Sequence, residues 1–150
     1  MRPAPKQQPV LRVATMADAK LLFVWRNDPE TRAASLTTEP LDWDAHLAWL
    51  GEVLENSDRR LWVAEEGGPV GQVRLDRHGD VEIISVSVAP SARGRGLAAR
   101  IIAAACAQAR GTVVARVRPD NDRSLRAFAA AGFVRTTNDV ELRWSTSTVP

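Results

Sequence analysis

Arg93-Gly94-Arg95-Gly96-Leu97-Ala98 is the stretch of this chain that decides the fold. It follows an apolar, β-branched segment at 81–88 and opens an alanine-rich segment at 97–110, so it predicts a tight turn from a strand into a helix. Two glycines let the backbone bend sharply and leave room for a ligand. The first N–H groups of a helix are unpaired and carry partial positive charge. With the two arginines, they predict a site for a phosphate or pyrophosphate group.

Two familiar phosphate loops fit this stretch poorly. Nucleoside triphosphatases need Lys followed by Ser or Thr after the last glycine, where this chain has Leu97 and Ala98. The dinucleotide pattern Gly-x-Gly-x-x-Gly matches only in its looser form, which ends in Ala. The form Arg-x-x-Gly-x-Ala after a strand resembles the pyrophosphate loop of the Gcn5-related N-acetyltransferase (GNAT) superfamily. The segment 121–128, followed by Ala131-Gly132-Phe133, is similar to that family's late helix and its Asn…Gly-Phe ending.

This resemblance, over roughly residues 60 to 144, implies an α+β fold. The expected sheet is mixed and mostly antiparallel, with about six to seven strands and about four flanking helices. It also implies an enzyme that moves an acetyl group from acetyl-coenzyme A (acetyl-CoA) to a primary amine of a small molecule. The cofactor would lie where two parallel strands splay apart. The residues implied to bind it are Val86, Ser87 and Val88 for pantetheine, Arg93, Gly94, Arg95, Gly96, Leu97 and Ala98 for pyrophosphate, and Asn121, Ser124 and Phe128 on the last helix.

Glu82 is the predicted catalytic base, because it is the sole carboxylate in the segment 81–88. Strict alternation puts it on an otherwise apolar face, although a solvent-facing glutamate near the sheet's end is an equal alternative. Many relatives carry a tyrosine, which protonates the leaving thiolate, where this chain has Phe128, and the chain has no tyrosine at all. Solvent, Ser124 or a water would then supply the proton, or the activity is weak. A non-catalytic module that binds acyl-CoA and regulates is the alternative of another class.

The acceptor has to be argued from the first third of the chain. Trp25-Arg26-Asn27 resembles a segment that lies near the acceptor in enzymes acetylating nucleotide-linked amino sugars. An arginine suits a diphosphate and a tryptophan can stack on a base or sugar. The competing interpretation gives Trp25, Trp43 and Trp49 core spacing and leaves His46 facing solvent. Aminoglycosides, polyamines and protein N-termini stay open as acceptors, although Arg116 stands where the enzymes that acetylate ribosomal proteins tend to place a glutamate.

Composition bounds the remaining possibilities. The chain has 150 residues, a formal net charge of +2 and one cysteine. So small a charge, with its arginines spread, argues against nucleic acid as a partner. Cys106 rules out an internal disulfide and a multi-cysteine zinc site, and its apolar helical setting predicts an inert buried thiol; no metal site is predicted. Without an apolar run of membrane-spanning length or a signal-peptide core, a cytoplasmic protein is the simplest expectation. Nothing requires or forbids a homodimer.

The predicted organisation is a flexible leader at 1–9, one acyl-CoA N-acyltransferase domain at 10–144 and a tail at 145–150. Thr15 with Asp18 has the spacing of a capping box, and Asp42 and either Asp120 or Asn121 are predicted N-caps. The segment 31–40 is expected to be irregular. The other predicted elements are strands at 10–14, 61–64, 70–75, 81–88, 112–117, 133–135 and 140–144, and helices at about 15–26, 42–54, 97–110 and 121–131.

Overall fold

A computed structural model describes residues 8–34, 39–136 and 141–145 of the chain. They form a seven-stranded sheet in the order β1-β2-β3-β4-β5-β7-β6. Every neighbouring pair is antiparallel except β4 and β5, which run parallel. The strands are β1 (Val10–Val13), β2 (Arg59–Glu65), β3 (Pro69–His78), β4 (Val81–Val88), β5 (Thr112–Arg116), β6 (Val134–Arg135) and β7 (Glu141–Trp144).

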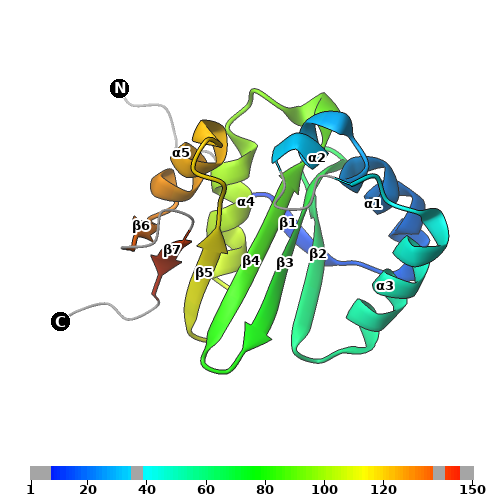
Figure 1. Cartoon of the computed structure of the whole chain (residues 1–150), viewed down its shortest axis with the longest axis horizontal. Coiled ribbons are helices and arrows are strands. Elements are labelled where there is room, and N and C mark those ends of the chain that lie inside the picture. Colours follow the sequence, from blue (N-terminus) through cyan, green and yellow to red (C-terminus); the bar gives the residue numbers. More distant parts are fainter. Residues whose placement is uncertain (1–7, 35–38, 137–140, 146–150) are drawn as a thin grey trace.

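The helices cover the sheet in two groups (Figure 1). Helices α4 and α5 lie together beside β4 and β5, while α1 and α3 lie at the other side of the view, with α2 at the top. Because β4 and β5 are parallel, a crossover is required between them, and α4 is that crossover. The helices of the described residues are α1 (Ala19–Arg26), α2 (Pro29–Ala34), α3 (Trp43–Glu55), α4 (Leu97–Cys106) and α5 (Asp122–Ala130).

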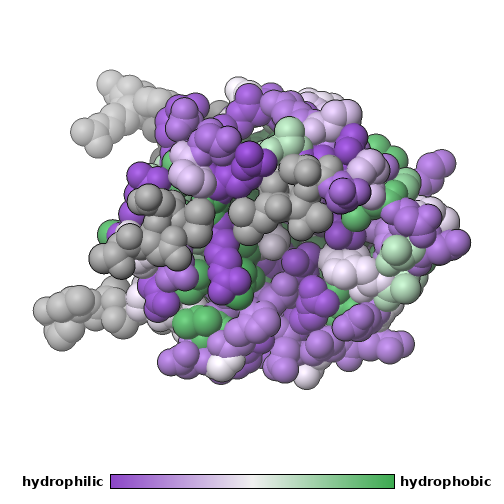
Figure 2. Space-filling model, viewed as in Figure 1, coloured by the Kyte–Doolittle hydropathy of each residue, from purple (hydrophilic) through white to green (hydrophobic). Residues whose placement is uncertain are grey.

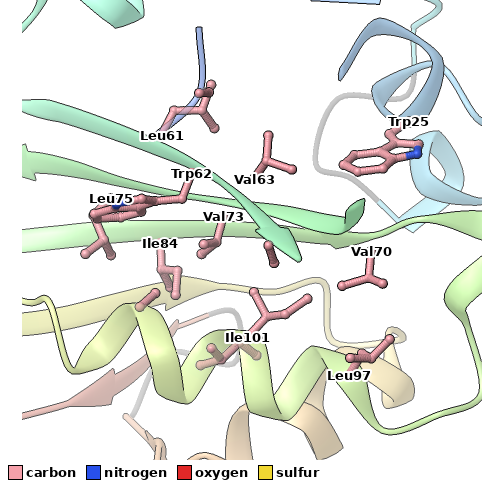
Figure 3. Close-up of a cluster of buried hydrophobic side chains, with 14 of the residues drawn as sticks. Trp25, Leu61, Trp62, Val63, Val70, Val73, Leu75, Ile84, Leu97 and Ile101 are labelled. Atoms are coloured by element: carbon pink, nitrogen blue, oxygen red, sulfur yellow. The ribbon is translucent and has the colours of Figure 1, made fainter. Parts of the chain in front are cut away.

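The apolar core has two halves, one on each face of the sheet. Figure 3 shows Leu97 and Ile101 of α4 on one side of the strands and Trp25 of α1 on the other. Close packing of α4 depends on Gly71 in β3, where an added Cβ would lie 2.6 Å from the Ser87 carbonyl oxygen and 3.0 Å from Cδ1 of Ile101. The register pairs Gly71 with Val88, so the even-numbered side chains of β4 face α4 and the odd-numbered ones face the opposite side.

Most local signals in the sequence are confirmed. Thr15 and Asp18 form the capping box, which precedes a short 3₁₀ turn before α1. The side chain of Asp42 accepts from the Ala45 N–H at the start of α3. Of the two residues predicted to cap the last helix, Asn121 is the N-cap. After α5, Gly132 has a φ of 99°, a backbone conformation that favours glycine.

Two expectations about the first third are wrong. The segment predicted to be irregular contains part of α2, which begins at Pro29 because proline suits the first turn of a helix. The Asp28 carboxylate caps this helix by accepting from the Thr31 N–H at 3.0 Å. His46 does not face solvent: it is 1% exposed, and its Nε2 lies 2.8 Å from the Ala19 carbonyl oxygen. The parts of the predicted leader and tail at 1–7 and 146–150 lie outside the described residues.

Candidate active site

The two parallel strands separate halfway along β4. Strand β4 pairs with β3 over its whole length, from Val81 to Val88. It pairs with β5 only from Val81 to Ile84, and the last partner on β5 is Ala115. In Figure 1, β4 and β5 run side by side at the lower end and diverge towards the top, where α2 lies. The second half of β4 therefore borders a gap in the sheet.

The main chain of Val86 and Val88 points into this gap. The Ala89 N–H donates to the Val70 carbonyl at 2.8 Å, so residue 89 turns its polar groups towards β3. In an antiparallel pair these groups alternate in direction along the strand, so Ser85 and Ser87 also bond towards β3. The main-chain N–H and C=O groups of Val86 and Val88 therefore point away from β3, to the side where β5 no longer pairs with β4. A buried N–H or C=O needs a partner, and here a ligand can supply it.

The loop at the end of β4 has the geometry that its glycines predict. Gly94 has a φ of 81° and Gly96 a φ of 68°, both in the left-handed region. Gly96 is the N-cap of α4, and no side chain caps this helix. An added Cβ at either glycine would meet nothing within 4 Å, so open space lies over the first turn of α4. Uncapped N–H groups facing open space form an anion site.

The two arginines of the loop differ in position. Arg95 is exposed and its Nε lies 3.4 Å from the Ala92 carbonyl oxygen. Arg93 turns towards α2, where it lies 2.8 Å from an oxygen of Asp28 and 2.8 Å from an oxygen of Glu30. The bond to Arg93 keeps the pKa of Asp28 below its usual range. Arg95 is thus the cation most available to a phosphate, while Arg93 fixes α2 to the loop.

Helix α2 is joined both to the loop before α4 and to the start of α5, which lie on the two sides of the gap. At one end Arg93 holds it to the loop before α4. At the other end, the Asn121 Nδ2 lies 3.4 Å from the Ala34 carbonyl oxygen and the Arg118 guanidinium lies 3.0 Å from that of Ala33. Arg123 of α5 also reaches Glu30 at 3.0 Å. The residue predicted to meet cofactor amides, Asn121, therefore caps α5 and ties it to α2.

The other two predicted cofactor residues on α5 differ in exposure. The ring of Phe128 is buried and meets Phe133 edge-on, with 5.0 Å between the ring centroids. Its hydrocarbon ring completes the core where relatives are expected to present a hydroxyl, so it carries no proton to a thiolate. Ser124 is half-buried, and its N–H donates to Asn121 at 3.2 Å. The role of both towards a cofactor stays a prediction.

Glu82 lies in the half of β4 that β5 covers, away from the gap. Its side chain is 3% exposed, one oxygen lies 2.8 Å from Arg60, and the other accepts from the Arg110 N–H at 2.7 Å. Burial, and to a lesser extent Glu82, raises the pKa of the neighbouring Cys106 thiol to about 12. Alternation did predict the inward orientation, yet both carboxylate oxygens already have partners. The catalytic role of Glu82 stays a prediction, and this geometry favours a structural one.

The three predicted acceptor residues are not brought together. Trp25 is buried in the core, and the Asn27 side chain accepts from the Leu41 N–H at 3.0 Å. Arg26 packs against α3: its guanidinium lies 3.7 Å from the centroid of the Trp49 ring, and its Nη1 is 3.0 Å from His46 Nδ1. Burial, then repulsion from Arg74 and Arg59, lowers the pKa of Arg26 to about 10.

Sequence reasoning overlooked polar side chains of β3 and β4 that lie on the face of the sheet opposite α4. Arg74 of β3 stands opposite Ser85 of β4 in the register, and its Nη2 lies 3.3 Å from the Ser85 hydroxyl. Ser87, two residues further along β4 and opposite Gln72, has the only buried side-chain oxygen among the described residues without a hydrogen-bond partner. The alternation of β-strands could have found them, because the last two odd-numbered positions of β4, 85 and 87, carry serines where a covered strand would carry apolar residues.

A sheet opened between two parallel strands, beside a glycine-kinked helix start, defines the GNAT fold, a class of acyl-group transferases. The chain belongs to the acetyltransferase (GNAT) family, whose sequence profile matches residues 20–133. No curated protein sequence matches it. Within the described segments, no helix has the length and hydropathy needed to cross a lipid bilayer.

Solved structures share this fold at low sequence identity. One is the aminoglycoside acetyltransferase AAC(6')-Ib in complex with paromomycin and acetyl-CoA, at 20% identity and a TM-score of 0.78, with 93% of this chain and 94% of that one covered. Another is the spermidine N-acetyltransferase of Vibrio cholerae with CoA and spermine, at 15% identity and a TM-score of 0.79, covering 91% and 92%. A domain from Methanocaldococcus jannaschii has 22% identity and a TM-score of 0.75, covering 92% and 97%.

Proposed function

We propose that this protein transfers an acetyl group from acetyl-CoA to a primary amine of a small molecule. The observation that carries the proposal is that residues 85–88 of β4 pair with β3 but not with β5. There, the main-chain groups of Val86 and Val88 point into a gap that ends at an open, uncapped helix start. A pantetheine arm, which contains amides, would complete the ladder that β5 leaves unfinished. Its pyrophosphate would then reach the N–H groups of residues 94–98.

In this arrangement, the predicted cofactor residues other than Ser124 and Phe128 each have a proposed part. The backbone from Val86 to Val88 would pair with pantetheine, and Gly94, Gly96, Leu97 and Ala98 would offer N–H groups to the phosphates. Arg95 would add a cation, because its side chain is exposed beside the loop. Asn121 and Arg93 would act through α2, which they hold over the gap.

Acetyl transfer requires a neutral amine to attack the thioester carbonyl. The new C–N bond forms, the C–S bond breaks, and the amine loses a proton while CoA leaves as a thiolate. The Val86 N–H, directed into the gap, is suited to polarise the carbonyl oxygen. No carboxylate lies in residues 85–88 of β4, so solvent is the simplest acceptor for the amine proton. The chain has no tyrosine, so solvent is also the simplest proton donor to the thiolate.

For the acceptor, a nucleotide-linked amino sugar is our proposal. Arg26 stacked on Trp49 supports it, because a guanidinium suits a phosphate and an indole suits a base or sugar. Aminoglycosides are the alternative that the AAC(6')-Ib structures suggest, and polyamines the one that the Vibrio cholerae enzyme suggests. Both are polycations, yet Asp28 and Glu30, the acidic residues nearest the gap, already pair with arginines.

A catalytically silent acyl-CoA-binding protein is the second candidate, because Phe128 is buried where relatives are expected to carry a tyrosine. Release of free thiol from acetyl-CoA over a panel of amines separates the two. Saturable binding of acetyl-CoA with no thiol released from any amine would favour the silent module. Thiol release that depends on an amine supports the enzyme.

The site itself is tested with a matched pair of tryptophan substitutions. Gly96 and Gly79 both have a positive φ, 68° and 64°, and both face open space. Gly79 lies in the turn before β4, at the opposite end of that strand. We expect Gly96→Trp to abolish the rise in Tm that acetyl-CoA produces, and Gly79→Trp to retain it. Equal protection of both variants would contradict the assignment of the loop.

A further inference from the structure

The gap is covered by α4 on one side, and on the other side it is exposed at the level of Ser85. The even-numbered side chains of β4 face α4, whose Leu97 and Ile101 are fully buried there. On the opposite face Ser85 and Arg116 are exposed. If the cofactor occupies the gap as proposed above, an amine can approach the thioester only from this open face. The side chains on that face therefore decide which amines are accepted.

Arginines dominate the open face where β4 and β5 separate. Arg74 lies opposite Ser85, and Arg116 follows Ala115, the last residue of β5 that pairs with β4. Because Ala115 faces α4, alternation directs Arg116 to the open face. Arg74, Ser85 and Arg116 thus form a row across three strands, one residue before Val86. A group bound in this row would lie beside Val86, the residue whose N–H is proposed to polarise the thioester carbonyl.

Among the described residues of this face, the arginines outnumber the carboxylates that pair with them. Arg59 and Arg74 share one carboxylate, that of Asp76, at 3.0 and 2.8 Å. Arg26 has the ring of Trp49 and the lone pair of His46 as partners. The guanidinium of Arg74 lies 5.2 Å from the centroid of the same Trp49 ring, so two cations flank one indole.

Arg116 adds a further cation at the edge of the gap. Its register partner on β7 is Glu141, but the Glu141 carboxylate pairs with Arg143, whose Nε is 3.1 Å away. In Figure 2, hydrophilic side chains cover much of the region where Figure 1 draws the lower parts of β3 and β4. A half-buried surface with surplus guanidinium groups attracts anions and repels polycations.

We propose that Arg74 and Arg116, continued by the Arg26–Trp49 pair, bind an anionic group of the acceptor, so that the acceptor is an amine carrying a carboxylate or phosphate a few bonds from its nitrogen. This inference rests on the proposed acetyl transfer and narrows its acceptor. This class of acceptors includes more than nucleotide-linked sugars, since an amino sugar phosphate or an amino acid also carries an amine near an anionic group. It disfavours aminoglycosides and polyamines, whose charges have the same sign as the site.

The test compares amines that differ only by the anion. D-Glucosamine 6-phosphate against D-glucosamine probes phosphate, 4-aminobutyrate against 4-aminobutanamide probes carboxylate, and spermidine probes a polycation. We expect kcat/KM for the anionic member of at least one pair to exceed that of its neutral partner by roughly tenfold to a hundredfold, the range of a charge-assisted hydrogen bond. The pair that shows the preference identifies the anion.

Arg116→Gln should remove most of that preference, mainly by raising KM for the anionic member. Arg110→Gln is the matched control, because the Arg110 side chain is exposed at the opposite end of β5 and its loss changes the net charge equally. Acetyl-CoA protection against heat is measured for both variants as a check of folding and cofactor binding.

The outcomes separate this inference from the proposed function. Thiol release that is as fast for neutral amines or spermidine as for the anionic members, or a preference that survives in Arg116→Gln, overturns the anion site while the transferase stands. Cofactor protection without thiol release from any amine overturns both the transferase and its acceptor.

Discussion

The two halves of β4 differ in what lies beside them. From Val81 to Ile84 the strand has a partner on each side, its one carboxylate is buried against Arg60, and the nearby Cys106 thiol is kept protonated by a raised pKa. From Ser85 to Val88 one partner is missing, the main chain is open, and Ser87 has an unpartnered hydroxyl. The first half holds the domain together, and the second half leaves its polar groups to a ligand. The number of neighbouring strands, rather than the amino-acid composition, distinguishes the stabilising half of β4 from the half proposed to bind a ligand.

Proline substitution is expected to give the largest contrast between the halves. In Ile84→Pro the lost N–H belongs to the ladder between β4 and β5 and the new ring sits in the core, so we expect about 3 kcal/mol or more of lost stability and little folded protein. In Val88→Pro the lost N–H points into the gap, so the domain should fold but lose protection by acetyl-CoA. Circular dichroism and a thermal-shift titration measure the two. Equal unfolding of both variants would break the comparison.

A thiol of α4 beside the first half of β4 and a thiol placed in its second half should react at very different rates. Cys106 has a pKa of about 12, so at pH 7 to 8 its thiolate fraction is roughly 10³-fold lower than that of an ordinary thiol. Ser85→Cys, made together with Cys106→Ala, puts a thiol on an exposed position beside Arg74, which favours the thiolate. We expect labelling by an aromatic disulfide to be at least about 10³-fold faster at position 85 than at Cys106. Similar labelling rates at the two positions would contradict the contrast between the buried first half of β4 and its exposed second half.

Glu82 decides whether the paired half has any part in catalysis. Glu82→Ala leaves Arg60 and the Arg110 N–H without their partner, and should cost about 2–4 kcal/mol of stability. Glu82→Gln keeps the shape and should cost less. If the residue is structural, turnover per folded molecule and its pH profile stay the same in Glu82→Gln. A large loss of kcat with an unchanged Tm would instead establish Glu82 as the base.

Ser87 should give the smallest effect, and one of unusual sign. A buried hydroxyl without a partner costs about 1–3 kcal/mol, so Ser87→Ala should stabilise the ligand-free protein, by about 1 kcal/mol. Ser85→Ala is the control, because that hydroxyl is exposed and bonds to Arg74. Urea unfolding followed by tryptophan fluorescence can resolve the difference. Destabilisation by Ser87→Ala would mean that the hydroxyl has a partner in solution.

The sequence predicted the parts of this molecule that depend on local chemistry. Capping residues such as Asp42, and the glycines before α4, act on their own neighbours, so spacing locates them, and for the last helix it narrowed the cap to Asp120 or Asn121. It failed where distant elements meet. Nothing near His46 reveals that the Ala19 carbonyl and Arg26 complete its hydrogen bonds, and nothing near Glu82 reveals Arg60, 22 residues away. The row of Arg74, Ser85 and Arg116 likewise exists only through strand register.

Helix α2 has no buried residue, so polar contacts, chiefly the ion pairs of Asp28 and Glu30 with Arg93 and Arg123, hold it over the gap. The Glu30 carboxylate is exposed, and exposed ion pairs contribute about 0–1 kcal/mol each and are screened by added salt over roughly 10 Å at 0.1 M, whereas the half-buried Arg93–Asp28 pair is screened less. The sheet beneath is held by apolar burial that salt does not weaken. Ionic strength therefore acts selectively on the cover of this site, and buffers that differ only in sodium chloride expose the gap to different degrees in an otherwise unchanged domain.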